Sequence, residues 1–113
     1  MNECRDILDR ITRFIDECGR EAERLDDGDD FTSLMAYKAV ALDLAQIGES
    51  VNSLRKKYPE ILTTEPDIPW GDIIGLRNII VHNYDGIIRD EIKESLRENL
   101  PALKSAVGRL RAS

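Results

Sequence analysis

One short stretch of the chain holds most of the side chains that could do chemistry. The segment RNIIVHNYDG begins at Arg77 and contains His82, which is the single histidine of the sequence. Asn78 and Tyr84 add an amide and a phenol within positions 77–84 of an otherwise aliphatic segment. This grouping has two interpretations: it builds a functional site, or it forms the polar end of a helix.

These residue types suit the cleavage of RNA. The ribose 2′-hydroxyl is a nucleophile that needs its proton removed, and the adjacent phosphate needs its developing charge stabilised. An imidazole such as that of His82 can act as base or acid near neutral pH, and the guanidinium of Arg77 offers a planar set of donors to phosphate oxygens. Asn78 could orient either group or contact the sugar, while Tyr84 could bond to phosphate or stack on a base. This chemistry requires no metal ion.

Helical geometry limits how these side chains can meet. Consecutive helical residues are rotated by about 100°, which places Tyr84 near the side of Arg77 and His82 about 140° away from Arg77. All three can face one groove only if the helix ends or bends near Val81. We therefore predict a helix end or bend there, with Ile74, Ile80 and Val81 anchoring the helix to the core.

Each residue also has an ordinary structural interpretation. His82 would bond to free carbonyls at a helix end, and Tyr84 would lie at the rim of the core. Arg77 would be an exposed ion-pair partner of Asp72 or Glu49. Spacing alone favours this structural interpretation, so the rest of the chain is needed to decide.

Long amphipathic helices are predicted to position the segment. From Cys4 to Leu25, apolar residues recur at three- and four-residue spacing with charged residues between them, which indicates a helix with one buried face. The sequence DDGDD ends this helix, since Gly28 can take a left-handed conformation and Asp29 or Asp30 can cap the next helix. The short connection predicts that the second helix runs antiparallel to the first.

The second helix, predicted from Phe31 to Lys57, carries two apolar stripes, which imply two packing contacts. One stripe can pack on the first helix. Small residues along the second helix would let another backbone come close, either from this chain or from a second copy. These residues are Ala36, Ala41, Ala45, Gly48 and Ser50.

Prolines divide the rest of the chain. The connector YPEILTTEPDIP is broken by Pro59, Pro66 and Pro69. A third helix is predicted to start near Pro69 or Trp70 and to carry the RNIIVHNYDG segment, which Gly86 ends. Residues 87–112 again have helical spacing, with a kink or break at Pro101. No segment has the pattern of a strand, so the sequence predicts an all-α fold, an antiparallel bundle of four to five helices in a single domain, 1–113.

Composition narrows the classes of function. The net charge of −6 and the pI near 4.8 argue against indiscriminate nucleic-acid binding, although a local basic groove remains open. No apolar run is long enough to span a membrane, and the N-terminal residues carry charges where a signal peptide has an apolar core, so we expect a soluble cytoplasmic protein.

Cys4 and Cys18 lie too far apart on one helix for a disulfide, which predicts buried free thiols. One histidine and two cysteines make no metal-ligand cluster, and no glycine-rich loop is present to bind a nucleotide.

The segment RNIIVHNY is similar to the signature of the HepT-like branch of the HEPN superfamily, in which a histidine follows an arginine after four residues and a tyrosine comes two residues later. LAQIGESVNSL, IPWGDIIGLRN and LPALKSAV agree with the same family, so the resemblance spans nearly the whole chain. It implies an α-helical, HEPN-like domain that forms a homodimer and places two motifs across a shared cleft.

The resemblance also implies a function. Members of this family are metal-independent endoribonucleases that need no cofactor. They commonly act as toxins whose partner is a small nucleotidyltransferase of the MNT type. Carried over to this sequence, Arg77 and His82 would be the catalytic pair and Asn78 the polar residue that follows the arginine. Tyr84 would be the tyrosine that the partner adenylylates to silence the nuclease.

Three functions remain to be separated. The leading hypothesis is a ribonuclease toxin of a toxin–antitoxin pair. The alternative is a non-catalytic helical module that binds a nucleotidyltransferase partner or a nucleotide, and the third is a structural dimerisation domain. The acidic net charge favours the second and third, whereas the combination of arginine, asparagine and histidine favours the first.

Overall fold

The computed structural model of the protein describes residues 3–82 and 89–113. Helices follow one another along the described chain in this order: α1 (Glu3–Ala22), α2 (Asp30–Lys57), α3 (Pro59–Leu62), α4 (Trp70–His82), α5 (Arg89–Glu94), the π-helical turn η1 (Ser95–Asn99) and α6 (Leu100–Ala112). None of these residues forms a strand. Because α5, η1 and α6 join without a gap, the described residues form five helical segments, and the predicted all-α fold is confirmed.

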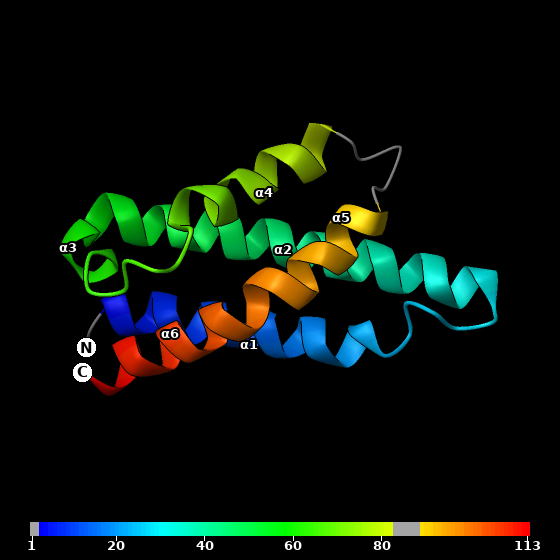
Figure 1. Ribbon diagram of the computed structural model, residues 1–113, viewed down its shortest axis with the longest axis horizontal. Helices are drawn as coiled ribbons and strands as arrows, with labels where there is room; N and C mark the ends of the chain where they lie inside the picture. The colour runs from blue at the N-terminus through cyan, green and yellow to red at the C-terminus, as the bar shows by residue number, and fades with distance from the viewer. Residues whose placement is uncertain (1–2, 83–88) are drawn as a thin grey trace.

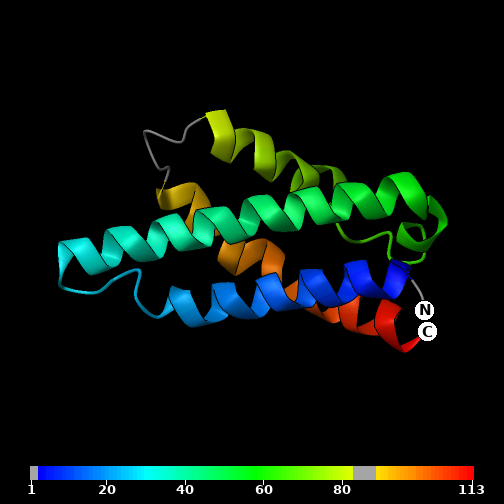
Figure 2. The ribbon, with the colours of Figure 1, turned by 180° about the vertical axis from the view of Figure 1, so that it is seen from behind.

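The helices α1 and α2 form the antiparallel hairpin that the sequence predicts (Figures 1 and 2). The apolar face of α1 is buried along its whole length against α2. Asp29 caps α2, because its carboxylate accepts a hydrogen bond from the backbone N–H of Thr32 at 2.9 Å. This cap fixes where α2 begins and, with it, the register of the hairpin.

The long helix α2 has several packing partners. It packs on α1 along one side, and α4 and α5 pack on it elsewhere. Val40, Ile47, Val51 and Leu54 along α2 have no exposed surface. The two apolar stripes predicted for this helix are therefore both used within one chain.

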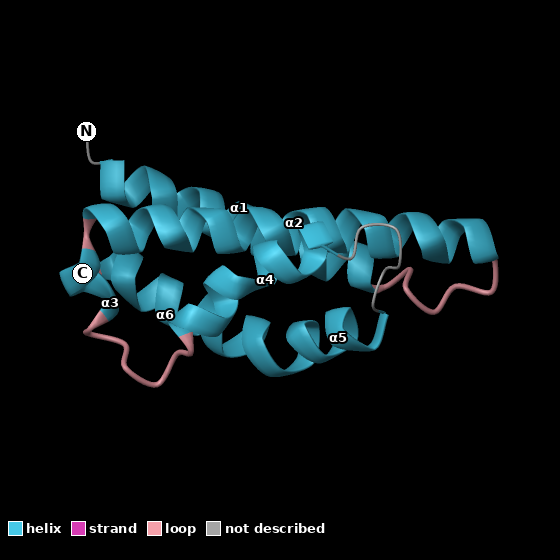
Figure 3. Cartoon of the chain, turned by 90° about the horizontal axis from the view of Figure 1, so that it is seen from above, coloured by secondary structure: helices cyan, strands magenta, loops and turns pink. Residues whose placement is uncertain are grey.

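The C-terminal run from α5 to α6 crosses one face of the α1–α2 hairpin (Figures 1 and 3). Within η1 the turn widens, and the N–H of Leu100 donates to the carbonyl of Ser95, five residues back. Pro101 follows directly and has no N–H to donate, so the widened turn accommodates it without ending the helix. The kink or break predicted at Pro101 is thus a change of helix type just before it.

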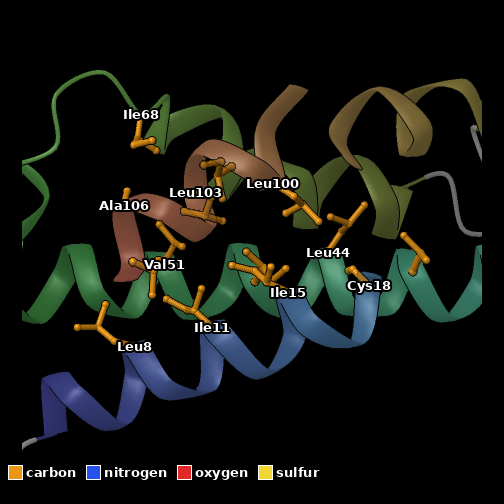
Figure 4. Close-up of a cluster of buried hydrophobic side chains, with 14 of the residues drawn as sticks. Leu8, Ile11, Ile15, Cys18, Leu44, Val51, Ile68, Leu100, Leu103 and Ala106 are labelled. Atoms are coloured by element: carbon orange, nitrogen blue, oxygen red, sulfur yellow. The ribbon is translucent and has the colours of Figure 1, made fainter. Parts of the chain in front are cut away.

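The core lies where α1, α2 and α6 meet (Figure 4). Ile11 of α1, Val51 of α2 and Leu103 of α6 are fully buried there. Cys4 and Cys18 are buried free thiols, as the sequence predicts. The connector between α2 and α4 packs against this body, since Leu62 and Ile68 are buried. Among the described residues, no helix is both long and apolar enough to cross a membrane.

Candidate active site

The helix α4 carries the candidate site, and His82 is its last described residue. The predicted helix end or bend near Val81 stays a prediction, because the residues that follow lie outside the described part of the chain. The side chains of Arg77, Asn78 and His82 are all exposed on this helix. Tyr84 and Gly86 lie outside the described residues, so their predicted roles stay predictions.

The backbone of α4 touches α2 at Gly48. A methyl group built on Gly48 would lie 2.8 Å from the carbonyl oxygen of Ile73, 3.2 Å from that of Ile74 and 3.4 Å from the amide nitrogen of Arg77. The first distance is too short for any real side-chain carbon, and the atom that it meets belongs to the backbone, which cannot simply rotate away. Glycine at position 48 is thus what allows α4 to lie this close to α2, at the level of Arg77.

The side chain of Arg77 is held by Glu49, the residue that follows Gly48 on α2. Its Nε lies 2.7 Å from Oε2 of Glu49, and both side chains are about half exposed. One terminal nitrogen of Arg77, Nη1, lies 3.5 Å from Oδ1 of Asn78, at the limit of a hydrogen bond. Of the two carboxylates that the sequence offers as partners, the structure selects Glu49.

His82 lies five residues beyond Arg77, about 7.5 Å further along the helix axis. Its side chain is exposed and makes no hydrogen bond or ion pair with another described residue. No hydrogen bond joins it to Arg77. The two candidate catalytic side chains are therefore both open to solvent on the last turns of α4, and a substrate could reach each of them.

Exposed aliphatic side chains surround this part of α4. Val81 is 55% exposed and Ile79 is 44% exposed, and Leu42 of α2 is 61% exposed. They line an apolar groove of about 480 Å³ between α2, α4 and α5. Of the three residues predicted to anchor α4, Ile74 and Ile80 are partly buried and pack against the core, whereas Val81 is exposed, so the prediction for Val81 is wrong. Ile73, near the start of α4, is the buried residue of this helix.

Within 3–82 and 89–113 the chain has no group of three or more histidine, cysteine, aspartate or glutamate side chains that could hold a metal ion. The acids at the site are dispersed: Glu49 pairs with Arg77, and Glu91 lies across the apolar groove. The chemistry available at the site is that of a guanidinium, an imidazole and an amide on one exposed helix end. Such a set can bind a phosphate and move a proton.

A sequence model of the family described as "Ribonuclease HepT-like" matches residues 4–110, which is nearly the entire chain. The protein belongs to this family. The HEPN resemblance of its RNIIVHNY segment is thereby confirmed, together with the all-α fold expected from it.

Curated HepT-like relatives agree with this assignment. "Putative RNase MJ1380" of Methanocaldococcus jannaschii is 33% identical over 65% of this chain and 64% of its own length. "Probable ribonuclease HepT" of Thermococcus cleftensis is 27% identical over 65% of this chain and 64% of its own length. The chain thus matches slightly less than two thirds of each relative. No solved structure gives a significant match.

Sequence patterns identified the motif residues and, in outline, their support from the second helix. Gly48 is one of the small residues predicted to let another backbone come close, and the structure confirms this approach, with α4 as the neighbour. Glu49 is one of the two carboxylates predicted as possible partners of Arg77, and it is the one that pairs. The patterns do not say which backbone approaches, or that the two contacts fall on consecutive residues of IGES.

Proposed function

We propose that this HepT-like protein is a metal-independent endoribonuclease in which Arg77 and His82 act on one RNA phosphodiester. The observation that carries the proposal is the exposure of both side chains at the end of α4 in a chain of this family. His82 takes the proton of a ribose 2′-hydroxyl, and the 2′-oxygen attacks the phosphorus. The 5′-oxygen leaves and takes up a proton, which yields a 2′,3′-cyclic phosphate and a 5′-hydroxyl end. Arg77 binds the phosphate oxygens as their charge develops.

The proposed enzyme works as a homodimer whose interface includes the apolar groove. Exposed Leu42, Ile79 and Val81 support this assignment, because contiguous aliphatic surface of this kind marks contact sites in soluble proteins. Lys38 and Glu91 also line the groove. A two-fold interface repeats the same patch on both copies, so that Lys38 of each copy could face Glu91 of the other. Val81, the residue before His82, lines the groove, so an interface here would bring the two motifs near one another.

Self-association tests the dimer directly. Light scattering at tens of micromolar should report a dimer for the wild type, because a specific interface normally holds at such concentrations. Val81→Asp should shift the species to monomer, since it places a charge in an apolar contact. The matched change Asp16→Asn on α1, which also alters one exposed charge, should not. A wild type that is strictly monomeric would contradict the shared cleft.

Cleavage in the presence of EDTA tests the activity. Single-stranded RNA should be cut to products that end in a 2′,3′-cyclic phosphate. His82→Ala and Arg77→Ala should each lower the rate by about 10²–10⁴-fold while the helical signal in circular dichroism is kept. Arg111→Ala is the matched control, because Arg111 is a partly exposed arginine that pairs with Asp9 between α6 and α1. A rate near wild type for either motif variant would exclude that residue from catalysis, and a need for added Mg²⁺ would exclude the metal-independent reaction.

The proposal extends to a toxin–antitoxin pair in the cytoplasm. Here the partner is an MNT-type nucleotidyltransferase, which adenylylates Tyr84 and so places a bulky, negatively charged group near Arg77. Support comes from the sequence, in which the tyrosine stands two residues after His82. Co-expression with such a transferase should add AMP to Tyr84, as read by peptide mass spectrometry, and should silence the wild type but not Tyr84→Phe. Equal silencing of both forms would show that the partner blocks the site simply by binding.

One observation favours a second candidate function, a non-catalytic module that binds a nucleotidyltransferase or a nucleotide. The chain carries a net charge of −6, and the guanidinium of Arg77 is already paired with Glu49. Both features disfavour a polyanionic substrate. RNA that stays intact with the wild type, together with tight binding of the transferase, would select this function.

A further inference from the structure

Both ends of the Arg77 side chain are fixed by consecutive residues of α2. Gly48 lets the backbone of α4 approach so closely that the amide nitrogen of Arg77 lies 3.4 Å from a methyl group built there. Glu49 then binds the head of the same side chain through Nε at 2.7 Å. The arginine is thus set at its base by close packing and at its tip by an ion pair.

This ion pair has little effect on stability. Both partners are about half exposed, and exposed pairs typically contribute about 1 kcal/mol or less to the free energy of unfolding. Its main effect is on the orientation of the Arg77 guanidinium. The guanidinium is a rigid plane, so one contact at Nε fixes the direction in which the remaining donors point.

The donors that remain are the ones that fit a phosphate. Glu49 occupies Nε, and the weak contact with Asn78 uses one N–H of Nη1. With Nε occupied, the outer edge formed by Nη1 and Nη2 is the edge that can still make paired, parallel hydrogen bonds with phosphate oxygens. Glu49 therefore holds the guanidinium side-on and leaves this edge for the substrate.

The carboxylate also has an opposing effect, because its negative charge lies beside the place where a phosphate would bind. It should weaken the binding of RNA, most strongly at low salt. Orientation and repulsion thus act on different kinetic constants. Orientation favours the transition state and raises kcat, whereas repulsion raises KM.

We propose that Glu49 is a positioning residue for Arg77, which orients the guanidinium for transition-state binding at the expense of RNA affinity. The inference rests on the proposed ribonuclease function. It assigns to Glu49 a role that an ordinary surface ion pair would not have.

Three variants separate the two effects. Glu49→Gln keeps an oxygen that can accept from Nε but removes the charge, so kcat should stay within about twofold of wild type while KM falls severalfold at low salt. Glu49→Ala removes both the accepting oxygen and the charge, so KM should fall as much as in Glu49→Gln, and kcat should fall by about tenfold. Asp9→Asn is the matched control, because Asp9 makes the same kind of contact with Nε of Arg111, at 2.8 Å, on the α1–α6 side. It should change neither constant. Wild-type kcat in Glu49→Ala would overturn the proposal.

A second measurement does not depend on cleavage. The Nε–Hε resonance of Arg77, assigned by its loss in Arg77→Lys, should show restricted motion in the wild type and in Glu49→Gln, and greater motion in Glu49→Ala. Equal mobility in all three would overturn the positioning role, even if RNA is cut. If no form cuts RNA, the proposed function fails, and this resonance alone still decides whether Glu49 orients Arg77.

Discussion

The α1–α2 hairpin and the second half of α4 differ in how far their apolar side chains are covered. On α1 the apolar face is buried along the whole helix, and its charged residues face away from the core. On α4 only Ile73 is buried, while Ile79 and Val81 near its end are exposed. The apolar face of α1 is covered within the chain, whereas the end of α4 is not. The uncovered part is also the part that carries Arg77 and His82, as expected if this surface serves the proposed dimer and RNA cleavage.

Truncating a core side chain should have the largest effect on folding and thereby test this contrast. Ile11→Ala removes a fully buried side chain of α1 and should lower the free energy of unfolding by about 2–5 kcal/mol. Val81→Ala on the exposed end of α4 should cost about 0.5 kcal/mol or less in dilute protein. Urea unfolding measures both values.

The comparison becomes sharper when protein concentration is varied. If a second copy covers the groove, the cost of Val81→Ala should grow with concentration, because association adds stability to the folded state. The cost of Ile11→Ala should not depend on concentration in this way. A large, concentration-independent loss for Val81→Ala would show that this residue packs within its own chain.

Two glycines on facing helices provide the next test. Gly48→Ala places a methyl group 2.8 Å from the Ile73 carbonyl, so α4 must move away, and the free energy of unfolding should fall by about 1–3 kcal/mol. Gly75→Ala on α4 meets nothing within 4 Å and should raise stability by about 0.5–1 kcal/mol through helix propensity. Thermal unfolding of both variants measures the difference. Equal effects would show that the close contact between α2 and α4 is not what Gly48 provides.

Much of this fold follows from periodicity, because each long helix has a regular apolar pattern and a clear end signal. The helix α2 begins one residue before the predicted Phe31, where Asp29 caps it, and α4 begins at Trp70, one of the two predicted starting points. Periodicity marks which residues are apolar but not what covers them. That is why Val81 was predicted as an anchor and is exposed instead. The widened turn before Pro101 was likewise beyond such patterns, since it depends on a missing N–H being accommodated by the neighbouring turn.

The motif residues could be found from sequence because their types are unusual in an aliphatic segment. Their support could be predicted only in part: the small residues of the second helix indicate that a backbone comes close, and Glu49 is one of two possible partners of Arg77. That the backbone at Gly48 is that of α4 near Ile73 depends on long-range packing, on which no local propensity acts. Asp43 shows a different limit. It lies three residues after Val40 and four before Ile47, on the buried side of α2, and is only 8% exposed, so a pattern of apolar residues does not reveal a carboxyl within the buried side.

Asp43 should make the stability of the hairpin depend on pH. Burial, and then the hydrogen bond and charge of Glu17, raise its pKa from 3.8 to about 7. Glu21 on α1 adds to the rise, and Arg20 opposes it. Cys18 also lies near, but burial raises its pKa to about 12, so it stays a neutral thiol.

The folded chain therefore binds this proton more tightly than the unfolded chain does. The stability that Asp43 contributes is fully present below about pH 4 and is lost as pH rises through about 7, because the carboxylate must then ionise beside other acids in a buried position. Asp43→Asn removes that charge and should raise the free energy of unfolding at about pH 8 by roughly 1 kcal/mol or more, with no comparable gain at about pH 4.5. Asp16→Asn makes the same chemical change at an exposed position of α1 and should leave the dependence on pH as it is. Urea unfolding of the three proteins at both pH values measures the slopes. Equal slopes for wild type and Asp43→Asn would show that the carboxyl of Asp43 does not hold a proton at neutral pH, and that the α1–α2 contact accommodates its charge after all.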